Sequence, residues 1–501
     1  MIFFNRIRSL NVGSIFVIIK LLCFTLFCSQ AKAQSTIQNA IYDIVRDEDF
    51  RHASLSICVI DLEKDSLIGA YQAYSSLAPA STMKIFTTYA ALSVLGKDFR
   101  FKTELEYDGE IIDSTLNGNI FIKGYGDPTL GSARFPRVDN IHQISKEFSK
   151  AIRGQNIYHI QGSIIGDGSY YNAQSIPDKW QWDDIGNYYG AGSFGLNIHD
   201  NEFTVFFAAQ RKENERPEIE RIFPVLHEMS LINGLICGPK NSGDNCIVFG
   251  EPIGKSRFLS GTIPAGNSRF FVRGSIPNPP LTCAQYLFNS YSSNKNTTIS
   301  GEAMDINNFL KASNTVSVRH SFYTYFSPKL SNIITQTNHR SVNLYAETLL
   351  RELGKNKYSI GSCESGLQAL YSFWKEKNLE MEGLYFEDGS GLCARNAVSA
   401  KHFVDALSIA YKDTLNGQIF YNSLPEAGKE GTVRSLISNY AGKGSVHIKS
   451  GSMTRVKSYA GYIESSSGRK YAFAFIANNY SCSSRAVKQK LGKLLVEILS
   501  Q

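Results

Sequence analysis

Strand patterns at the two ends of the chain constrain its fold more than any other feature of the sequence. Residues 54–61 (SLSICVID) alternate apolar and polar side chains, which predicts a strand with one buried face, and a second strand follows near 67–72. Three further strand patterns lie near the C-terminus, at 445–449, 459–463 and 471–477. We expect these five strands to form one mixed or antiparallel sheet with helices packed against it.

Helical patterns accompany the strands at both ends. One begins near Ser81 and stops at Gly96, and another begins at Ser341 and is expected to stop at Gly354. A closing helix runs from Ser484, with apolar residues at three- and four-residue steps. The helix near Ser81 has to reach the same core as the C-terminal half, so the part of the chain between them is predicted to be an insertion.

The middle of the chain has a different pattern, with short apolar runs between glycine-rich turns. We expect residues 99–314 to form an inserted β-rich region, most simply two nested domains. Residues 34–98 and 315–501 then make one discontinuous domain. The chain has 501 residues, more than one ordinary domain holds. The predicted fold class is α+β.

Residues 1–33 have the pattern of a secretory signal peptide. Arg6 and Arg8 precede an apolar stretch at 12–27, and small residues at positions 31 and 33 mark a cleavage site before Gln34. The alternative is an uncleaved anchor helix. We expect export to the periplasm or cell envelope. Loss of this segment removes four basic and no acidic residues, lowering the formal charge from +7 to +3. Such a charge gives no electrostatic case for nucleic-acid binding.

The cysteines and histidines predict no metal or cofactor site. Seven cysteines follow the signal segment, scattered and odd in number, and the sequence has no CxxC or HExxH motif. Cys237 and Cys246 are the only close pair, and whether they form a disulfide is left open.

A serine and a lysine one helical turn apart are the first candidate catalytic residues. A serine hydroxyl needs a base, and Ser81 and Lys84 would share one face of a helix start, where the helix dipole favours a neutral lysine. The same spacing follows Ser292, Ser372 and Ser467, where a solvated surface pair is the expected interpretation. Ser81 differs because it opens an apolar helix after a proline turn.

Two further motifs lie downstream. Ser341 and Asn343 are separated by one residue where a helix is expected to open, and an N-cap serine is the structural alternative. Lys449-Ser450-Gly451 lies at a predicted strand end and is the only K-[ST]-G in the chain. A glycine there would let a substrate backbone approach the strand edge, whereas a plain turn between two strands is the alternative.

The three motifs together resemble those of the penicillin-recognising serine enzymes, which carry SxxK, SxN and K[ST]G in this order. The 260 residues between Ser81 and Ser341 are similar to the long gap in the class C low-molecular-mass penicillin-binding proteins, the D-alanyl-D-alanine carboxypeptidase/endopeptidase family. Ser450 departs from the more usual threonine and keeps the hydroxyl. Four further segments also resemble that family: GDPTL at 126–130, WQWDD at 180–184, YYGAG at 188–192 and EDGSGLCARNAVSA at 387–400.

The resemblance implies a serine β-lactamase/DD-peptidase-like domain and a role for each motif residue. Ser81 would be the acylated nucleophile and Lys84 its base, while Ser341 would relay a proton to the leaving group. Asn343 would hold the acyl-side amide, and Lys449 would supply positive potential.

The resemblance also implies a set of substrate-binding residues. Ser450 would bind the terminal carboxylate, Gly451 would admit the substrate backbone, and the backbone N–H groups of Ser81 and Ser452 would form the oxyanion hole. Asp184 would meet a cationic group on the peptide stem, or else be an ordinary loop acid.

The function implied is a serine-type D-alanyl-D-alanine carboxypeptidase or endopeptidase acting on peptidoglycan stem peptides, with β-lactams as covalent inhibitors. A β-lactamase or esterase of the same superfamily is one alternative, disfavoured by the long insertion and the lack of an obvious deacylating base. A catalytically silent wall-binding protein is the other, and the intact motifs argue against it.

Overall fold

The structure is a computed structural model that describes residues 36–136, 138–252, 254–313 and 317–501. The predicted signal peptide and its cleavage site lie outside the described residues. The chain forms two compact units. Unit 1 comprises residues up to 77, 398–411 and 425–501, and unit 2 comprises 78–397 and 412–424. The residues predicted to form one discontinuous domain are therefore shared between both units.

Unit 1 is built on a five-stranded sheet of order β19-β20-β21-β1-β2, in which every neighbouring pair is antiparallel. This confirms the expected single sheet from both chain ends, and β19 lies at one edge. The strands are β1 (Ser54–Asp61), β2 (Ser66–Tyr71), β19 (Ser445–Met453), β20 (Val456–Glu464) and β21 (Lys470–Asn478).

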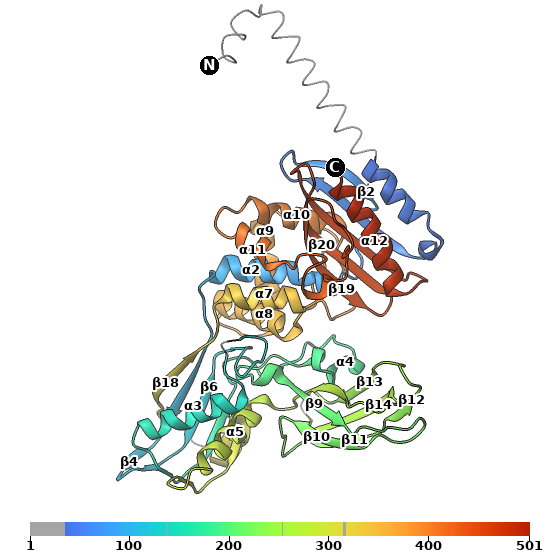
Figure 1. Ribbon diagram of the computed structural model, residues 1–501. Helices are drawn as coiled ribbons and strands as arrows, with labels where there is room; N and C mark the ends of the chain where they lie inside the picture. Colours follow the sequence, from blue (N-terminus) through green and yellow to red (C-terminus); the bar gives the residue numbers. More distant parts are fainter. Residues whose placement is uncertain (1–35, 137, 253, 314–316) are drawn as a thin grey trace, which may run out of the picture. The chain divides into compact units, whose positions relative to one another are not determined.

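Helices cover both faces of this sheet. On one face a helix over 36–45 and α12 (Ser484–Leu499) pack against the strands in one apolar core (Figure 1). On the other face Ser56 accepts a hydrogen bond from the N–H of Ala400 at the start of α10 (Ala400–Lys412). β1 is consequently buried from Leu55 onward, so the prediction of a single buried face is wrong. Unit 1 also holds the short turns η2 (Glu48–Phe50) and η6 (Gly431–Val433).

The helical part of unit 2 surrounds an aromatic core. Phe86 and Tyr89 of α2 pack on Trp374, with ring centroids 5.3 and 5.6 Å apart. The helices of this part are η3 (Ala80–Met83), α2 (Lys84–Leu95), α7 (Leu330–Arg340), α8 (Asn343–Tyr358), α9 (Cys363–Glu376) and α11 (Gly417–Ser423).

The rest of unit 2 holds four sheets with helices between them (Figure 1). One five-stranded sheet has the order β17-β8-β6-β3-β18 and comprises β3 (Lys102–Tyr107), β6 (Ile120–Gly124), β8 (Ile164–Asp167), β17 (Ala303–Asp305) and β18 (His320–Phe326). The chain thus re-enters this sheet after residue 314, where the insertion was expected to end.

The other three sheets of unit 2 are smaller. One sheet comprises β4 (Glu110–Ile112), β5 (Thr115–Asn117), β7 (His159–Ile160) and β16 (Thr298–Ile299). A second comprises β9 (Glu202–Phe207), β10 (Ile219–Phe223) and β15 (Phe270–Ser275). The third comprises β11 (Ser230–Asn233), β12 (Ile236–Gly238), β13 (Asn245–Gly250) and β14 (Ser256–Pro264). The helices here are α3 (Ile141–Gly154), α4 (Trp182–Ile185), α5 (Pro279–Ser292) and α6 (Ile306–Ser313), with the turns η4 (Tyr188–Gly190) and η5 (His199–Asn201).

Several predicted helix boundaries are wrong. The α-helix after Ser81 begins only at Lys84, because residues 80–83 form the tighter 3₁₀ turn η3. Gly354 does not end its helix but lies inside α8, where an added Cβ would come within 2.4 Å of the Ser365 hydroxyl of α9. That glycine serves close helix packing. In the described part of the chain no helix has the length and apolarity needed to cross a membrane.

Candidate active site

The turn η3 and the start of α2 carry Ser81 and Lys84. Thr82 closes this turn, because its hydroxyl donates to the Pro79 carbonyl at 2.6 Å. Ala80 takes the left-handed φ of 47°, an unfavourable conformation for a residue with a Cβ. The turn leaves Ser81 partly exposed, whereas Lys84, three residues later, is fully buried.

The Lys84 ammonium is held by three oxygen acceptors. Its Nζ donates to Ser81 Oγ at 3.0 Å, to Asn343 Oδ1 at 2.6 Å and to the Ser390 carbonyl at 2.7 Å. An ammonium group has three N–H donors, so this set uses all of them. Asn343 and Ser390, both far from Lys84 in sequence, therefore hold the lysine beside the Ser81 hydroxyl.

Burial lowers the pKa of Lys84 from 10.5 to about 7, against the opposing effect of the Asp388 and Glu347 carboxylates. A lysine with such a pKa is substantially neutral near neutral pH and can accept a proton. Burial is the main cause of the lowered pKa.

Two buried carboxylates hold the 388–393 segment beside Lys84. Glu347 of α8 accepts the N–H groups of Ser390 at 2.8 Å and of Gly389 at 3.1 Å. Asp388 accepts the N–H of Gly391 at 2.7 Å and the indole N–H of Trp180 at 2.8 Å. These bonds fix the backbone whose Ser390 carbonyl binds Lys84.

Sequence reasoning missed Glu347 and included Asp388 only within the segment 387–400 that resembles the related family. The one available signal for Glu347 is its position four residues after Asn343, an acid in an otherwise apolar part of the helix. Its pKa is raised by burial and by the nearby Asp388. Cys393, which lies in the same segment, donates its backbone N–H to Asp388 at 2.7 Å.

Asp184 is linked to this cluster through Tyr189. Asn343 Nδ2 donates to the Tyr189 carbonyl at 2.9 Å, and the Tyr189 side chain is hydrogen-bonded to the Asp184 carboxyl. Burial raises the pKa of Asp184 to about 6, with a further contribution from Asp183. The structure thus brings Ser81, Lys84, Asn343 and Asp184 into one connected set within unit 2.

Ser341 lies at a helix end rather than a helix start. It caps the C-terminus of α7 in the left-handed conformation, with φ 58° and ψ 42°, and Val342 is the N-cap of α8. The expectation that Ser341 opens a helix, and the alternative that it is an N-cap, are therefore both wrong. Its tight turn between two helices places Asn343 as the first residue of α8.

The K-S-G motif lies in unit 1, in the middle of an edge strand. β19 continues to Met453, and Lys449, Ser450 and Gly451 pair with Ala460, Tyr459 and Ser458 of β20. The predictions of a strand end, or of a turn, are wrong because the ladder to β20 runs through the motif.

Side chains alternate along β19 as in any strand. Lys449 and Gly451 are buried, whereas Ser450 is partly exposed and Ser452 is exposed. Lys449 Nζ donates to the Ser450 carbonyl at 2.6 Å, and the Ser450 hydroxyl is 2.7 Å from that of Thr432, which sequence reasoning missed.

The remaining candidates play no part in this cluster. Ser292 is an exposed residue at the end of α5, and Lys357 binds the Ser372 hydroxyl. Cys237 and Cys246 lie on β12 and β13, and both are free. The described residues contain no group of three histidine, cysteine or acidic side chains placed to hold a metal ion.

Comparisons with known proteins identify the family of the chain. The family model of the D-Ala-D-Ala carboxypeptidase 3 (S13) family matches residues 37–501. The chain is 25% identical over 455 residues to the D-alanyl-D-alanine carboxypeptidase of Actinomadura sp. (strain R39), covering 87% of this chain and 80% of that protein. It is 23% identical over 440 residues to D-alanyl-D-alanine carboxypeptidase DacB of Haemophilus influenzae, covering 87% of each.

A solved structure gives the same fold. Penicillin binding protein 4 (dacB) from Haemophilus influenzae superposes with a TM-score of 0.77 at 21% identity, covering 92% of this chain and 99% of that one. The predicted α+β fold of the DD-peptidase type is thereby confirmed. Since the family model spans nearly the whole described chain, the protein belongs to the D-Ala-D-Ala carboxypeptidase 3 (S13) family of serine peptidases.

Proposed function

We propose that this enzyme releases the terminal D-alanine from D-Ala–D-Ala stem peptides of peptidoglycan through an acyl-enzyme on Ser81. The observation that carries the proposal is the buried Lys84, whose Nζ lies 3.0 Å from Ser81 Oγ and whose pKa burial lowers to about 7. A base of this pKa beside a serine is what nucleophilic catalysis by a hydroxyl requires.

The reaction follows from these groups. Ser81 Oγ attacks the carbonyl carbon of the penultimate D-alanine while its proton passes to Lys84. The amide C–N bond then breaks, and the leaving D-alanine nitrogen takes that proton, relayed by Ser341. Water hydrolyses the ester in a second step, with Lys84 again accepting a proton. The N–H groups of Ser81 and Ser452 stabilise the oxyanion in both steps.

The other motif residues bind the substrate. Asn343 holds the acyl-side amide, and Lys449 with Ser450 binds the terminal carboxylate, which Gly451 lets approach β19. Asp184 meets a cationic group of the stem peptide. Cleavage of D-Ala–diaminopimelate cross-links uses the same groups.

β-Lactams acylate Ser81 in this proposal, because they present a carboxylate and a reactive amide in the same arrangement as the dipeptide. One solved structure of the Haemophilus influenzae protein holds a β-lactam. Export to the periplasm or cell envelope is also part of the proposal and rests on the residue pattern of 1–33.

Replacing Ser81 tests the proposal. Ser81→Ala should abolish covalent labelling by penicillin and lower D-alanine release at least about 10⁴-fold, because the nucleophile is gone. Labelling on a gel and release of D-alanine from a stem pentapeptide measure the two effects. Ser292→Ala, with the same spacing to a lysine, is the matched control and should behave as wild type.

Three results would contradict the proposal. Labelling that persists in Ser81→Ala would place the nucleophile elsewhere. A wild-type label that hydrolyses within seconds would point to a β-lactamase. A wild-type protein that takes no label and releases no D-alanine would be a silent wall-binding protein.

A further inference from the structure

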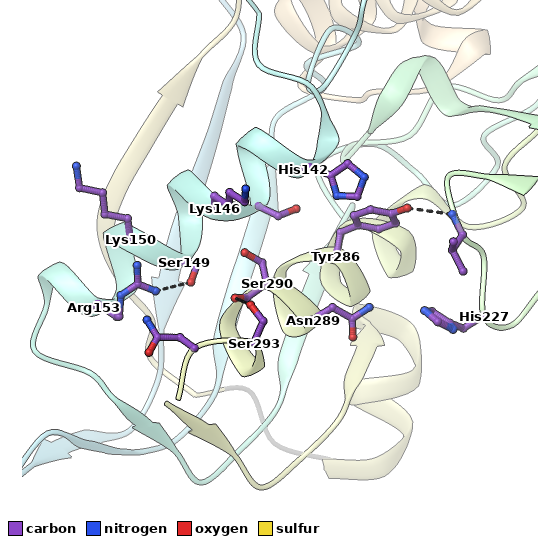
Figure 2. Close-up of a pocket in the computed structure, with 13 residues that line it drawn as sticks. His142, Lys146, Ser149, Lys150, Arg153, His227, Tyr286, Asn289, Ser290 and Ser293 are labelled. Atoms are coloured by element: carbon purple, nitrogen blue, oxygen red, sulfur yellow. Dashed lines mark hydrogen bonds between the residues drawn. The ribbon is translucent and has the colours of Figure 1, made fainter. Parts of the chain in front are cut away.

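An open groove runs between α3 and α5 in unit 2, apart from the residues assigned to the reaction. The two helices pack through apolar side chains in one core, and their outer faces enclose a cavity of about 830 Å³ (Figure 2). The segment that follows β10 closes one end with Val225 and His227. Cavities of this size are typical of ligand sites.

The α3 wall of the groove is basic. His142, Lys146, Lys150 and Arg153 recur at three- and four-residue steps, so they follow one face of the helix. Arg153 donates to Ser149 Oγ at 2.6 Å. No residue that lines the cavity is acidic, and among the described residues no carboxylate pairs with Lys146, Lys150 or Arg153.

Three arginines of the same unit are neutralised by acids. Arg134 and Arg273 both lie 3.2 Å from Glu202, and Arg319 lies 2.7 Å from Asp167. The groove therefore keeps a row of positive charge that its own unit does not neutralise. Such a row attracts an anionic ligand with more than one charge.

The α5 wall is polar and neutral. Asn289 and Ser290 of α5 and Ser293 of the following turn line the cavity and supply amide and hydroxyl groups (Figure 2). Tyr286 is held in place because its hydroxyl accepts the N–H of Val225 at 2.9 Å, and its ring lies 5.3 Å from that of His142. Tyr286 itself is buried, so the exposed ring at this end of the groove is the His142 imidazole.

We propose that this groove binds a glycan segment of peptidoglycan together with the free carboxylates of its attached stem peptides, remote from the peptide that is cleaved. The basic row pairs with these carboxylates, and the amide and hydroxyl wall hydrogen-bonds to sugar hydroxyl and acetamido groups. An anionic membrane supplies phosphates but presents a flat surface to this concave site. The inference rests on the proposed function, because that function identifies peptidoglycan as the polymer.

A pair of matched double variants tests the groove. Lys146→Gln/Lys150→Gln removes two charges from the α3 wall, and Lys240→Gln/Lys375→Gln removes two exposed, unpaired lysines elsewhere in unit 2. The probe is purified sacculi in a co-sedimentation assay at low and high salt. The groove variant should bind about tenfold more weakly and lose most of its salt dependence, whereas the control should bind as wild type. Release of D-alanine from a soluble pentapeptide should stay within twofold in both.

Several outcomes would overturn the inference. Equal loss of sacculus binding in both double variants would mean that net charge alone matters, and no loss in either would mean that the groove is unused. Tighter groove-dependent binding to anionic phospholipid vesicles than to sacculi would assign the site to membranes. A protein that binds sacculi through the groove but releases no D-alanine would refute the proposed reaction and leave the groove intact.

Discussion

At the scale of single residues, burial lowers the pKa of Lys84 so that it can act as a base, and two nearby acids limit this lowering. Lys84 is fully buried, and burial alone would disfavour its charged form strongly. Glu347 and Asp388 raise the pKa of Lys84 and so oppose this, leaving it at about 7. The base is therefore tuned by groups that never touch the serine.

Glu347→Gln should separate the effect of the Glu347 charge on the pKa of Lys84 from the structural role of Glu347 as a hydrogen-bond acceptor. The variant keeps the side-chain shape but loses the negative charge that raises the pKa of Lys84, so that pKa should fall further. The rate of acylation by a penicillin rises as Lys84 loses its proton, and its midpoint should therefore move from near 7 to lower pH. The plateau should fall about tenfold or less, because one backbone acceptor is weakened. Stopped-flow acylation between pH 5 and 9 measures both.

Glu352→Gln is the control for this prediction. Glu352 is a second buried acid of α8, but its carboxylate accepts the hydroxyl of Tyr171 at 2.8 Å and has no bond to the Lys84 cluster. Its removal should leave the midpoint unchanged. A midpoint that stays in place or rises in Glu347→Gln would show that the acid acts only as structural support.

At the scale of elements, the terminal sheet and the closing helix were predictable from the sequence. The five strands and α12 follow periodic apolar patterns, and their bounds agree within a few residues with those expected. β1 was mispredicted in one respect, because periodicity at a strand does not reveal that α10 covers its second face.

The local backbone at the motifs was not predictable. Ser341 takes a left-handed turn that a serine seldom adopts, and nothing in its neighbours indicates this. The K-S-G motif continues a strand because its partner β20, not its own sequence, decides where the ladder ends. The motif spacing identified the candidate residues, whereas Glu347 and Thr432 required the tertiary structure.

Gly391 should be indispensable to the reaction centre. It has φ +81°, and an added Cβ would lie 1.9 Å from the carbonyl oxygen of Ala80, the residue before Ser81. Gly391→Ala should therefore displace η3 and lower the penicillin acylation rate at least about tenfold, at a cost in stability above the 1–2 kcal/mol or so of a left-handed alanine. Acylation kinetics and urea unfolding measure the two effects.

Gly243→Ala provides the matched comparison. Gly243 has nearly the same φ, +82°, but no atom lies within 4 Å of an added Cβ. It should lose stability through backbone strain alone and acylate at the wild-type rate. If both variants acylated equally fast, the contact between Gly391 and Ala80 would have no role in positioning Ser81.

At the scale of the whole molecule, unit 2 concentrates acids whose pKa is raised by burial. The carboxylates with a raised pKa are Asp127, Asp184, Glu202, Glu347 and Glu352, and burial is the main cause for each. His199 and Lys84 oppose them, because burial lowers the pKa of each. The acids outnumber these two groups, so the folded chain should bind more protons than the unfolded chain at mildly acidic pH, and its stability should rise from pH 7 to pH 5.

Asp127 is the cleanest test of this pH dependence. Its Oδ1 accepts the N–H and hydroxyl of Thr129 at 2.8 and 2.7 Å, and burial raises its pKa from 3.8 to about 6. Its stabilising contribution is complete below pH 3.8 and is lost as the pH rises through 6, which amounts to about 1 kcal/mol between pH 5 and pH 7. Asp127→Asn keeps the acceptor and cannot titrate, so the difference in unfolding free energy between these two pH values should shrink by that amount in urea titrations. Asp98→Asn is the control, because the Lys329 hydrogen bond lowers the pKa of Asp98 and keeps it ionised throughout this range. An Asp127→Asn variant with the wild-type difference would mean that this carboxyl is ionised in the folded protein, and its buried Oδ2 would then need a cationic partner.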